Sequence, residues 1–294
     1  MLQKKDFKNI RGTIKMGKSL AGYTWVKTGG EAEMFFEPKD IDDLVCFLQQ
    51  VRPGTSVQYI GGGSNLLVVD EGVKGVVIKL GMAFSSIELN DKGQVVCGAA
   101  AMPVSISHFA CKNSLKGLEF MSTIPGTIGG AIFGNAGCFG GEIKDVLASC
   151  KVVSEDGDIG ELSNKDCGFV YRKSDITDFI VEATFNVEEG VQEEIAEKIS
   201  EQKKKRSAGQ PMGEKTFGSC FKNPEGTSAG ALIDQAGLKG FSIGGAAVSE
   251  KHANFLINKG GATTQDFLDL IAHIQKVVLE RDNIKLETEV RILS

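Results

Sequence analysis

Two polar side chains stand in short motifs that could bind an anion or transfer a proton. Arg172 lies in the stretch YRKSD, and a guanidinium can grip a carboxylate through two hydrogen bonds and stabilise charge that develops on it. The same side chain could instead be a surface arginine paired with Asp175. Ser219 lies in the stretch GSCFKNP, and its hydroxyl is a poor acid near neutral pH, from which only a strong base such as a carbanion could take the proton. It could equally be a loop serine that bonds the backbone.

The run 285–293 is predicted to be a strand with one apolar and one charged face. Period-two alternation places three apolar residues opposite three charged ones, which are Leu286, Val290 and Ile292 against Glu287, Glu289 and Arg291. Read from this pattern alone, both glutamates are solvated strand residues, and the pattern selects neither.

Glycine accounts for 37 of the 294 residues, where about 7% is typical. One cluster, Gly61-Gly62-Gly63-Ser64-Asn65, could turn successive backbone N–H groups toward one anion, with Ser64 and Asn65 adding side-chain donors. A Rossmann or Walker loop must open a helix, whereas the following run, 66–80, looks like a hairpin. A tight turn without a ligand explains this loop equally well.

A second uncharged, glycine-rich loop covers residues 124–130 and is followed by Asn135-Ala136-Gly137. Two such loops in one chain favour a large flat ligand packed against bare backbone, with two unrelated turns as the alternative. The longer segment 120–141 contains no charged residue. Its Pro125 and its glycines indicate a buried turn region rather than a membrane span.

Composition argues against several classes of protein. A net charge of -5 lacks the basic bias of a nucleic-acid binder, so the run Lys203–Arg206 is interpreted as a solvated helix end.

Seven widely spaced cysteines without a C-x-x-C motif indicate reduced thiols, and no histidine motif supports Cys220 as a nucleophile. The three histidines lack metal-ligand spacing, so no metal site is predicted, and His252 is taken as structural. The N-terminal residues have no apolar core, which argues against a secretory signal.

Helices and strands are mixed without regular βαβ alternation, which predicts an α+β fold. The clearest helix begins after an N-cap at Thr263 and has an apolar face of Phe267, Ile271, Ile274 and Val278. The other expected helices cover 40–50, 103–114 and 191–207, and the expected strands cover 34–36, 57–60, 87–89, 94–97, 151–154 and 179–185.

Taken together, these motifs resemble one family. The order GGGSN, LEFMSTIPGTIGGAIFGNAGCFGGEI, YRKSD, GSCFKNP, SEKHANFLIN and a terminal EVR closely resembles the bacterial UDP-N-acetylenolpyruvoylglucosamine reductase family, MurB, in its shorter type without an inserted tyrosine loop. The resemblance runs from about residue 24 to residue 293. One departure is Thr288, which replaces the proline of the family's Pro-Glu-Val-Arg.

The resemblance implies an FAD-binding fold of the vanillyl-alcohol-oxidase type with two α+β subdomains, residues 1–81 (with 291–294) and 82–200, and an α+β substrate domain, 201–290. It implies an FAD-dependent, NADPH-consuming reductase that converts UDP-N-acetylglucosamine enolpyruvate to UDP-N-acetylmuramate for peptidoglycan, as a cytoplasmic monomer with no nucleic-acid or membrane partner. A flavin oxidase of the same fold and a nucleotide-binding protein without catalysis are the alternatives.

Residue roles follow from the same resemblance. Arg172 would stabilise the substrate carboxylate, Ser219 would protonate the intermediate, and Glu289 would support them. The FAD-binding residues would be Tyr59, Ile60, Gly61, Gly62, Gly63, Ser64, Asn65, Pro125, Gly126, Thr127, Gly129 and Gly130. The substrate-binding residues would be Lys222, Asn223, Arg206 and Gln210.

Overall fold

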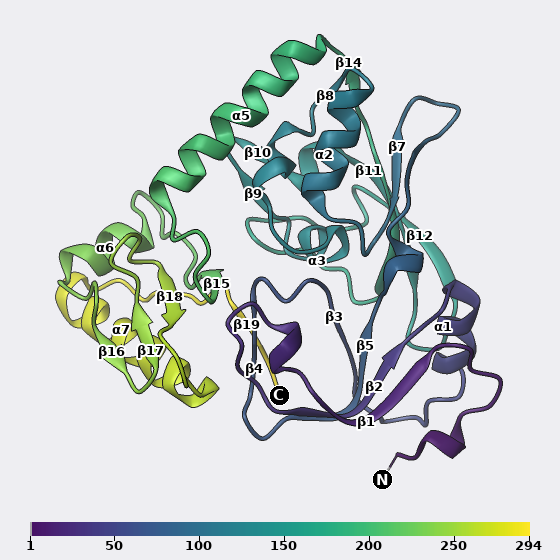
Figure 1. The fold of residues 1–294 in the computed structure, drawn as a ribbon, viewed down its shortest axis with the longest axis horizontal. Coiled ribbons are helices and arrows are strands. Elements are labelled where there is room, and N and C mark those ends of the chain that lie inside the picture. The colour runs from purple at the N-terminus through teal and green to yellow at the C-terminus, as the bar shows by residue number, and fades with distance from the viewer. Residues whose placement is uncertain (1) are drawn as a thin grey trace. The chain divides into compact units, whose positions relative to one another are not determined.

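The chain folds into two units, each assembled from segments that lie far apart in the sequence. The computed structural model describes residues 2–294 (Figure 1). Unit 1 contains the residues up to 16, 34–62 and 75–206, and unit 2 contains 17–33, 63–74 and 207–294. Several strands of the N-terminal sheet cross from one unit into the other, so the division follows packing rather than chain order.

A four-stranded sheet with the order β1-β2-β5-β3 forms from the N-terminal part of the chain. Strands β3 and β5 pair in parallel, and helix α1 begins at an N-cap, Asp40, whose side chain accepts the Asp43 N–H. In the core beside this sheet, the rings of Phe36 and Phe47 stack 4.0 Å apart. The elements are η1 (Lys4–Asp6), β1 (Thr13–Ser19), β2 (Glu31–Glu37), α1 (Ile41–Leu48), β3 (Val57–Ile60) and β5 (Val73–Lys79).

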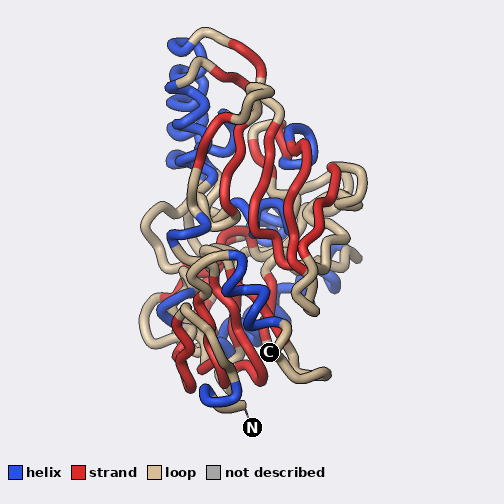
Figure 2. The backbone as a smooth tube through the Cα atoms, turned by 90° about the vertical axis from the view of Figure 1, so that its right-hand side faces the viewer, coloured by secondary structure: helices blue, strands red, loops and turns tan. Residues whose placement is uncertain are grey.

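A five-stranded antiparallel sheet with the order β12-β11-β13-β7-β6 builds the rest of unit 1, and its strands lie side by side in Figure 2. Helices α2 and α3 pack against it. The strands are β6 (Ile87–Leu89), β7 (Val95–Gly98), β11 (Leu147–Val153), β12 (Ile159–Ser163) and β13 (Phe179–Phe185).

Short elements and one long helix complete unit 1. Two small ribbons pair β9 with β10 and β8 with β14. The segment 120–141, predicted as a buried turn region, is buried at 120–124 and in part of α3, whereas its end is partly exposed, and it contains short helices. The elements are η3 (Met82–Phe84), α2 (Pro103–Lys112), β8 (Leu115–Lys116), η4 (Glu119–Thr123), α3 (Ile128–Phe133), β9 (Gly137–Cys138), β10 (Gly141–Glu142), α4 (Ile143–Val146), β14 (Glu188–Glu189) and α5 (Gln192–Gly209).

Unit 2 is built on a four-stranded antiparallel sheet with the order β15-β18-β17-β16. Helix α7 begins with the predicted cap, in which Thr263 and Asp266 exchange side-chain and backbone hydrogen bonds. All four residues of its predicted apolar face are buried. The elements are η2 (Ala21–Tyr23), β4 (Leu66–Val68), β15 (Thr216–Ser219), α6 (Ala229–Gln235), β16 (Ser242–Ile243), β17 (Ala246–Val248), β18 (Phe255–Asn258), α7 (Thr264–Asp282) and β19 (Arg291–Leu293).

Two sequence-based expectations about strands are wrong. The run 66–80 is no hairpin, because β4 pairs in parallel with β19 while β5 belongs to the four-stranded sheet. The predicted strand 285–293 is a strand only at Arg291–Leu293, after a bridge between Phe221 and Thr288. Between the bridge at Thr288 and strand β19, the chain changes the segment with which it pairs. The inward and outward alternation of side chains therefore does not continue through both parts, and Ile292 is exposed rather than buried.

Candidate functional site

In unit 1 the first glycines of the loop pack directly on the second glycine-rich loop. A Cβ atom added at Gly62 would lie 2.5 Å from the Cα of Gly126 and 3.3 Å from the Thr127 nitrogen. One added at Gly61 would lie 2.5 Å from the Thr127 hydroxyl oxygen. Only glycine allows this approach of two backbones, so the two loops predicted to share a ligand do lie against each other.

The backbone of the second loop is fixed to the turn that follows β7 in unit 1. The N–H groups of Ile128 and Gly129 donate to the carbonyls of Ala101 and Ala99, at 2.8 and 2.9 Å. Nearby in the sequence, the Ser122 hydroxyl is buried and has no hydrogen-bond partner among the described residues. Such an orphaned polar atom is what a bound ligand would satisfy.

Four other residues predicted to bind the cofactor have distinct environments. The Tyr59 ring packs edge-on against Phe179 and Phe133, with centroids 5.1 and 6.2 Å away. Ile60 is buried at the end of β3, and Pro125 is partly exposed. Gly130 is exposed and follows the buried Gly129 in α3.

In unit 2 the remaining part of the glycine loop is held by backbone contacts. Gly63 has a φ of 66°, and its carbonyl accepts the Trp25 N–H at 3.0 Å. A Cβ at Gly63 would collide with the Tyr23 carbonyl, so this position requires glycine. The Asn65 Nδ2 donates to the Glu289 carbonyl at 3.2 Å, and the buried Asn65 Oδ1 has no hydrogen-bond partner among residues 2–294.

Arg172 occupies the tip of a tight turn in unit 1. The backbones of Val170 and Lys173 bridge each other, and Arg172 between them has a left-handed φ of 57°. Its Nη2 donates to the Gly137 carbonyl at 2.9 Å, and its Nη1 lies 3.6 Å from Glu142 Oε1. The alternative of a surface pair with Asp175 is wrong, because Lys173 is the residue that pairs with that carboxylate.

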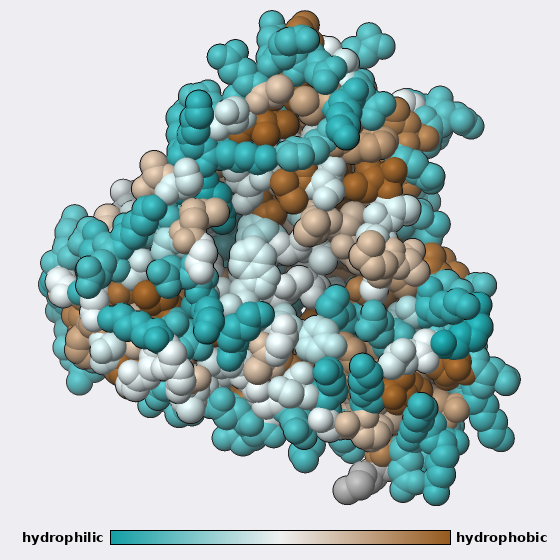
Figure 3. Space-filling model, viewed as in Figure 1, coloured by the Kyte–Doolittle hydropathy of each residue, from teal (hydrophilic) through white to brown (hydrophobic). Residues whose placement is uncertain are grey.

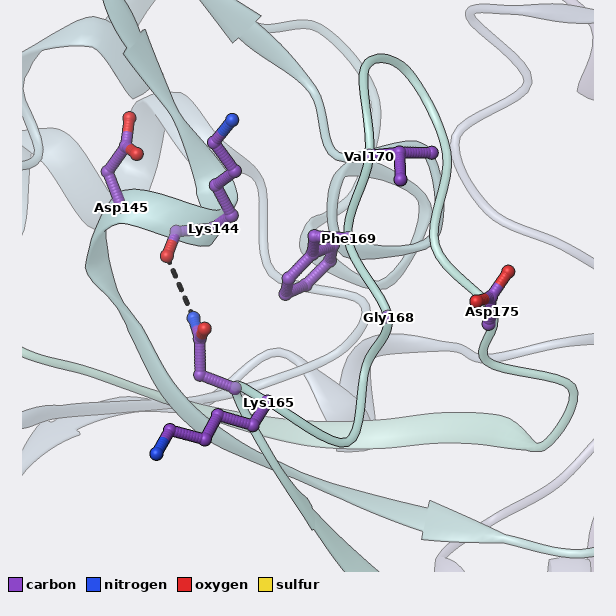
Figure 4. Close-up of a pocket in the computed structure, with 8 residues that line it drawn as sticks. Lys144, Asp145, Lys165, Gly168, Phe169, Val170 and Asp175 are labelled. Atoms are coloured by element: carbon purple, nitrogen blue, oxygen red, sulfur yellow. Dashed lines mark hydrogen bonds between the residues drawn. The ribbon is translucent and has the colours of Figure 1, made fainter.

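The outer side of the same turn lines an open depression of about 590 Å³ (Figure 4). Phe169, Val170 and Asp175 line it, and across it the Asn164 amide donates to the Lys144 carbonyl at 2.8 Å. The depression is shallow and solvent-exposed, and Arg172 does not line it. We therefore assign no ligand to it.

Ser219 and Glu289 come together in unit 2 through Cys220. Ser219 is the last residue of β15, after a bulge at Gly218, where φ is 78°. The Glu289 N–H donates to the Cys220 carbonyl at 2.8 Å, so the two predicted catalytic residues lie on adjoining backbone segments. Both side chains are partly exposed.

Cys220 is buried within this arrangement. Burial, and then the nearby charge of Glu289, raise the pKa of its thiol. A buried thiol that keeps its proton is a poor nucleophile, which supports the interpretation that Cys220 takes no part in nucleophilic chemistry.

The predicted substrate-binding residues have varied surroundings. Lys222 forms an ion pair with Glu287, and the Asn223 side chain accepts the Ala229 N–H at 3.1 Å. The Gln210 Oε1 is buried and accepts no hydrogen bond within the described part of the chain.

Arg206 belongs to the basic run at the end of α5. It is half-buried in unit 1, and burial lowers the pKa of its guanidinium, partly offset by Cys138. The run otherwise fits a solvated helix end, since Lys204 and Lys205 are exposed and the visible surface over α5 is mostly hydrophilic (Figure 3).

Other candidate sites are weak. All seven cysteines are free, with the buried Cys150 and Cys167 sulfurs 3.9 Å apart. His252 is half-buried, and its Nδ1 accepts the Asn254 N–H at 3.2 Å, in keeping with a structural role. Residues 2–294 contain no group of three or more acidic, cysteine or histidine side chains placed to hold a metal. In the same range, no helix combines the length and apolarity that crossing a membrane would need.

Sequence reasoning missed Glu142 and Asn135, which surround Arg172. Asn135 is fully buried with a φ of 40°, and it lies in the stretch GNAG, to which sequence analysis assigns no role for the asparagine. A buried asparagine in a left-handed conformation marks a constrained position, but the sequence does not reveal that conformation. For Glu142, nothing in the sequence apart from its charge indicates a functional role.

Comparison with known proteins places this geometry in context. The family model described as an FAD binding domain matches residues 32–163, and that of the UDP-N-acetylenolpyruvoylglucosamine reductase C-terminal domain matches residues 210–293. A reductase of that name from Rickettsia bellii (strain RML369-C) is 40% identical over 284 residues, covering 96% of this chain and 94% of the relative. The one from Sphingopyxis alaskensis is 41% identical, covering 96% and 95%.

A solved structure is similar over the whole chain. The crystal structure of UDP-N-acetylenolpyruvylglucosamine reductase (MurB) from Thermus caldophilus matches with a TM-score of 0.84 and 33% identity, covering 97% of this chain and 99% of that one. Together with the family models, this confirms the predicted α+β fold class, an FAD-binding region followed by a C-terminal domain.

Proposed function

Since the chain belongs to the UDP-N-acetylenolpyruvoylglucosamine reductase family, we propose that it reduces UDP-N-acetylglucosamine enolpyruvate to UDP-N-acetylmuramate, with FAD as its cofactor and NADPH as its reductant. The observation that carries this proposal is a reductase 40% identical across 96% of the chain. We also propose a cytoplasmic monomer that serves peptidoglycan synthesis, with FAD subdomains at 1–81 and 82–200 and a substrate domain at 201–290.

The residues present fit an FAD molecule. At Gly62 and Gly126 the two backbones pack directly on each other, without side chains between them. A diphosphate could therefore approach the main-chain N–H groups of the loop. The orphaned polar atoms of Ser122 and Asn65 provide hydrogen-bonding capacity in each unit. When bound, FAD supplies the hydride chemistry that protein side chains lack.

Arg172 is proposed to bind the substrate carboxylate. A guanidinium presents paired donors that match a carboxylate, and its charge stabilises the negative charge that grows there during the reaction. Its main chain is fixed by the 170–173 turn and its Nη2 by the Gly137 carbonyl. A side chain held in this way needs little reorganisation when the substrate arrives.

Ser219 is proposed to give a proton to the substrate carbon, with Glu289 supporting it. The serine hydroxyl is a weak acid, so correct placement matters more than its pKa. The bond between the Glu289 N–H and the Cys220 carbonyl keeps the two residues on neighbouring backbone.

Lys222, Asn223, Arg206 and Gln210 are proposed to bind the nucleotide part of the substrate. On binding, Lys222 would give up its ion pair with the exposed Glu287 side chain and pair with a phosphate group instead. Solvent around the exposed glutamate weakens this ion pair, which lowers the cost of the exchange.

An anaerobic titration tests the proposed function. The purified protein should be yellow, lose its visible colour when limiting NADPH is added, and regain it when UDP-N-acetylglucosamine enolpyruvate follows. Recovery of the colour only after air is admitted would identify a flavin oxidase instead. A protein that stays colourless even after incubation with FAD would contradict the proposal.

A further inference from the structure

The carboxylate of Glu142 lies beside the Arg172 guanidinium and is itself held from several directions. Its Oε2 accepts a hydrogen bond from Asn135 Nδ2 at 3.1 Å and lies 2.9 Å from Lys144 Nζ. The side chain also accepts the backbone N–H of Asp145 in a capping box at the start of α4. With so many partners, the glutamate is fixed independently of Arg172.

The other oxygen of Glu142 faces the arginine. Oε1 lies 3.6 Å from Arg172 Nη1, which is a charge contact longer than a hydrogen bond. On the second branch of the guanidinium, Nη2 donates to the Gly137 carbonyl at 2.9 Å. Both charged side chains are about four-fifths buried, with 20% and 23% exposure, so water screens this contact less than it would a surface pair.

Asn135 ties the glutamate to the turn that carries the arginine. Its Nδ2 also donates to the Val170 carbonyl at 2.9 Å, and its Oδ1 accepts the Lys144 N–H at 3.0 Å. One buried side chain thus joins β10, α4 and the 170–173 turn. The position of Glu142 relative to the arginine turn is therefore set by hydrogen bonds at both ends.

We propose that Glu142 is a positioning residue, whose carboxylate, fixed by Asn135, Lys144 and the start of α4, holds the Arg172 guanidinium in the orientation that receives the substrate carboxylate. The proposal rests on the role given to Arg172 in the proposed function. Within residues 2–294, the polar contacts given for the Glu142 side chain are with Arg172, Asn135, Lys144 and the start of α4, so we place its effect on the reaction through Arg172. Because an arginine has several rotatable bonds, losing this charge partner would remove one of the contacts that restrict the orientation of the guanidinium.

Glu142→Gln tests the proposal, since glutamine keeps the shape and an acceptor oxygen but removes the charge. In the FAD-loaded protein, loss of colour with NADPH should be unchanged. Recovery of colour with the enolpyruvyl substrate should slow by about tenfold to a hundredfold, as expected when a reacting group is misplaced. Calorimetry should show weaker substrate binding. Glu88→Gln, an exposed charge removal on β6, serves as the matched control and should leave both steps unchanged.

Chemical rescue separates positioning from a general structural effect. Arg172→Ala should be slow in the second step, and added guanidinium chloride at non-denaturing concentration should restore it partly, since Glu142 can seat the free cation. The same addition should fail in Arg172→Ala/Glu142→Gln. Glu142→Asp, which keeps the charge, should be closer to the parent protein than Glu142→Gln is.

The outcomes distinguish the positioning role of Glu142 from the role of Arg172 in the proposed function. If Arg172→Ala is slow while Glu142→Gln matches the parent protein, the positioning role is wrong and the proposed function stands. Equal rescue of the single and double variants would also overturn the positioning role. If Arg172→Ala itself reacts at the parent rate, the role of Arg172 in the proposed function fails, and the positioning role fails with it.

Discussion

The side-chain amide of Asn65 donates a hydrogen bond to the main-chain oxygen of Glu289, 224 residues further along the chain. This bond joins the end of the glycine loop to the segment that carries a predicted catalytic carboxylate. A second contact, from the Arg291 N–H to the Asn65 carbonyl at 3.3 Å, lies beside it. Changes at Asn65 should therefore affect residues from both ends of unit 2.

Asn65→Ala should lower the free energy of unfolding by about 1 kcal/mol, the usual net value of a hydrogen bond. Asn65→Asp should cost more, about 2 kcal/mol, because it sets a carboxylate against the Glu289 carbonyl. Urea unfolding of the cofactor-free protein measures both. Equal stability of the aspartate variant and the parent protein would show that the bond is not formed in solution.

Gly62→Ala should weaken FAD binding. The added methyl group meets the Gly126 Cα at 2.5 Å, so the two loops must separate. Overpacking of this kind costs about 1–3 kcal/mol, which corresponds to about a fivefold to 150-fold loss of affinity. Fluorescence titration of the cofactor-free protein with FAD measures it. Gly209→Ala is the control, since nothing lies within 4 Å of its added Cβ, and it should bind FAD like the parent protein.

Ser219→Ala should separate the two halves of the reaction. Loss of the proton donor should slow recovery of colour with the enolpyruvyl substrate by about a hundredfold or more, and leave bleaching by NADPH unchanged. Stopped-flow absorbance under anaerobic conditions measures each step. Ser242→Ala, on the exposed part of β16, is the matched control. A serine variant that slows both steps equally would argue against a specific proton-transfer role.

Cys220 should resist alkylation in the folded protein. It is fully buried, so the reagent cannot reach its sulfur. Burial also raises the pKa of its thiol, so little of the reactive thiolate is present. Brief treatment with iodoacetamide followed by peptide mass spectrometry should find label on the partly exposed Cys46 and Cys111 before it appears on Cys220. Labelling of all three at one rate would contradict the packing described around Ser219.

His252 should make the protein less stable in mild acid. Burial lowers the pKa of this histidine below its ordinary value of 6.5, so near that pH the unfolded chain binds a proton that the folded chain does not. The free energy of unfolding should then fall as pH drops from above 6.5 toward the lowered pKa. Protonation would also remove the Nδ1 acceptor used by Asn254.

Urea titrations above and below pH 6.5 measure this dependence. His252→Gln should flatten it, whereas His108→Gln should change it less, because His108 is exposed and solvent screens its charge. A slope that persists unchanged in His252→Gln would assign the dependence to another group.

Periodicity and caps in the sequence were enough to predict the long helices. Helix α7 was expected from one N-cap and four apolar residues, because tertiary packing here reinforces a pattern already strong by itself. The close approach of the two glycine loops is likewise in line with the sequence, because glycines without side chains allow two backbones to lie against each other.

Long-range pairing was not predictable. Whether β4 pairs with β5 or with β19 depends on partners distant in the chain, and no local pattern in 66–80 distinguishes them. The supports of Arg172 were missed for a similar reason, since Asn135 and Glu142 acquire their roles only when three separate segments meet.

The parallel pairing of β4 with β19 has a consequence for biosynthesis. Strand β4 is made early, but its partner leaves the ribosome only after more than two hundred further residues have been added. Until then β4 exposes unpaired backbone groups, and the segment that ends the glycine loop lacks its support. Unit 2 can therefore be completed only late, after most of unit 1 has been synthesised, so the support of the glycine loop by the β19 segment forms only once that segment has been made.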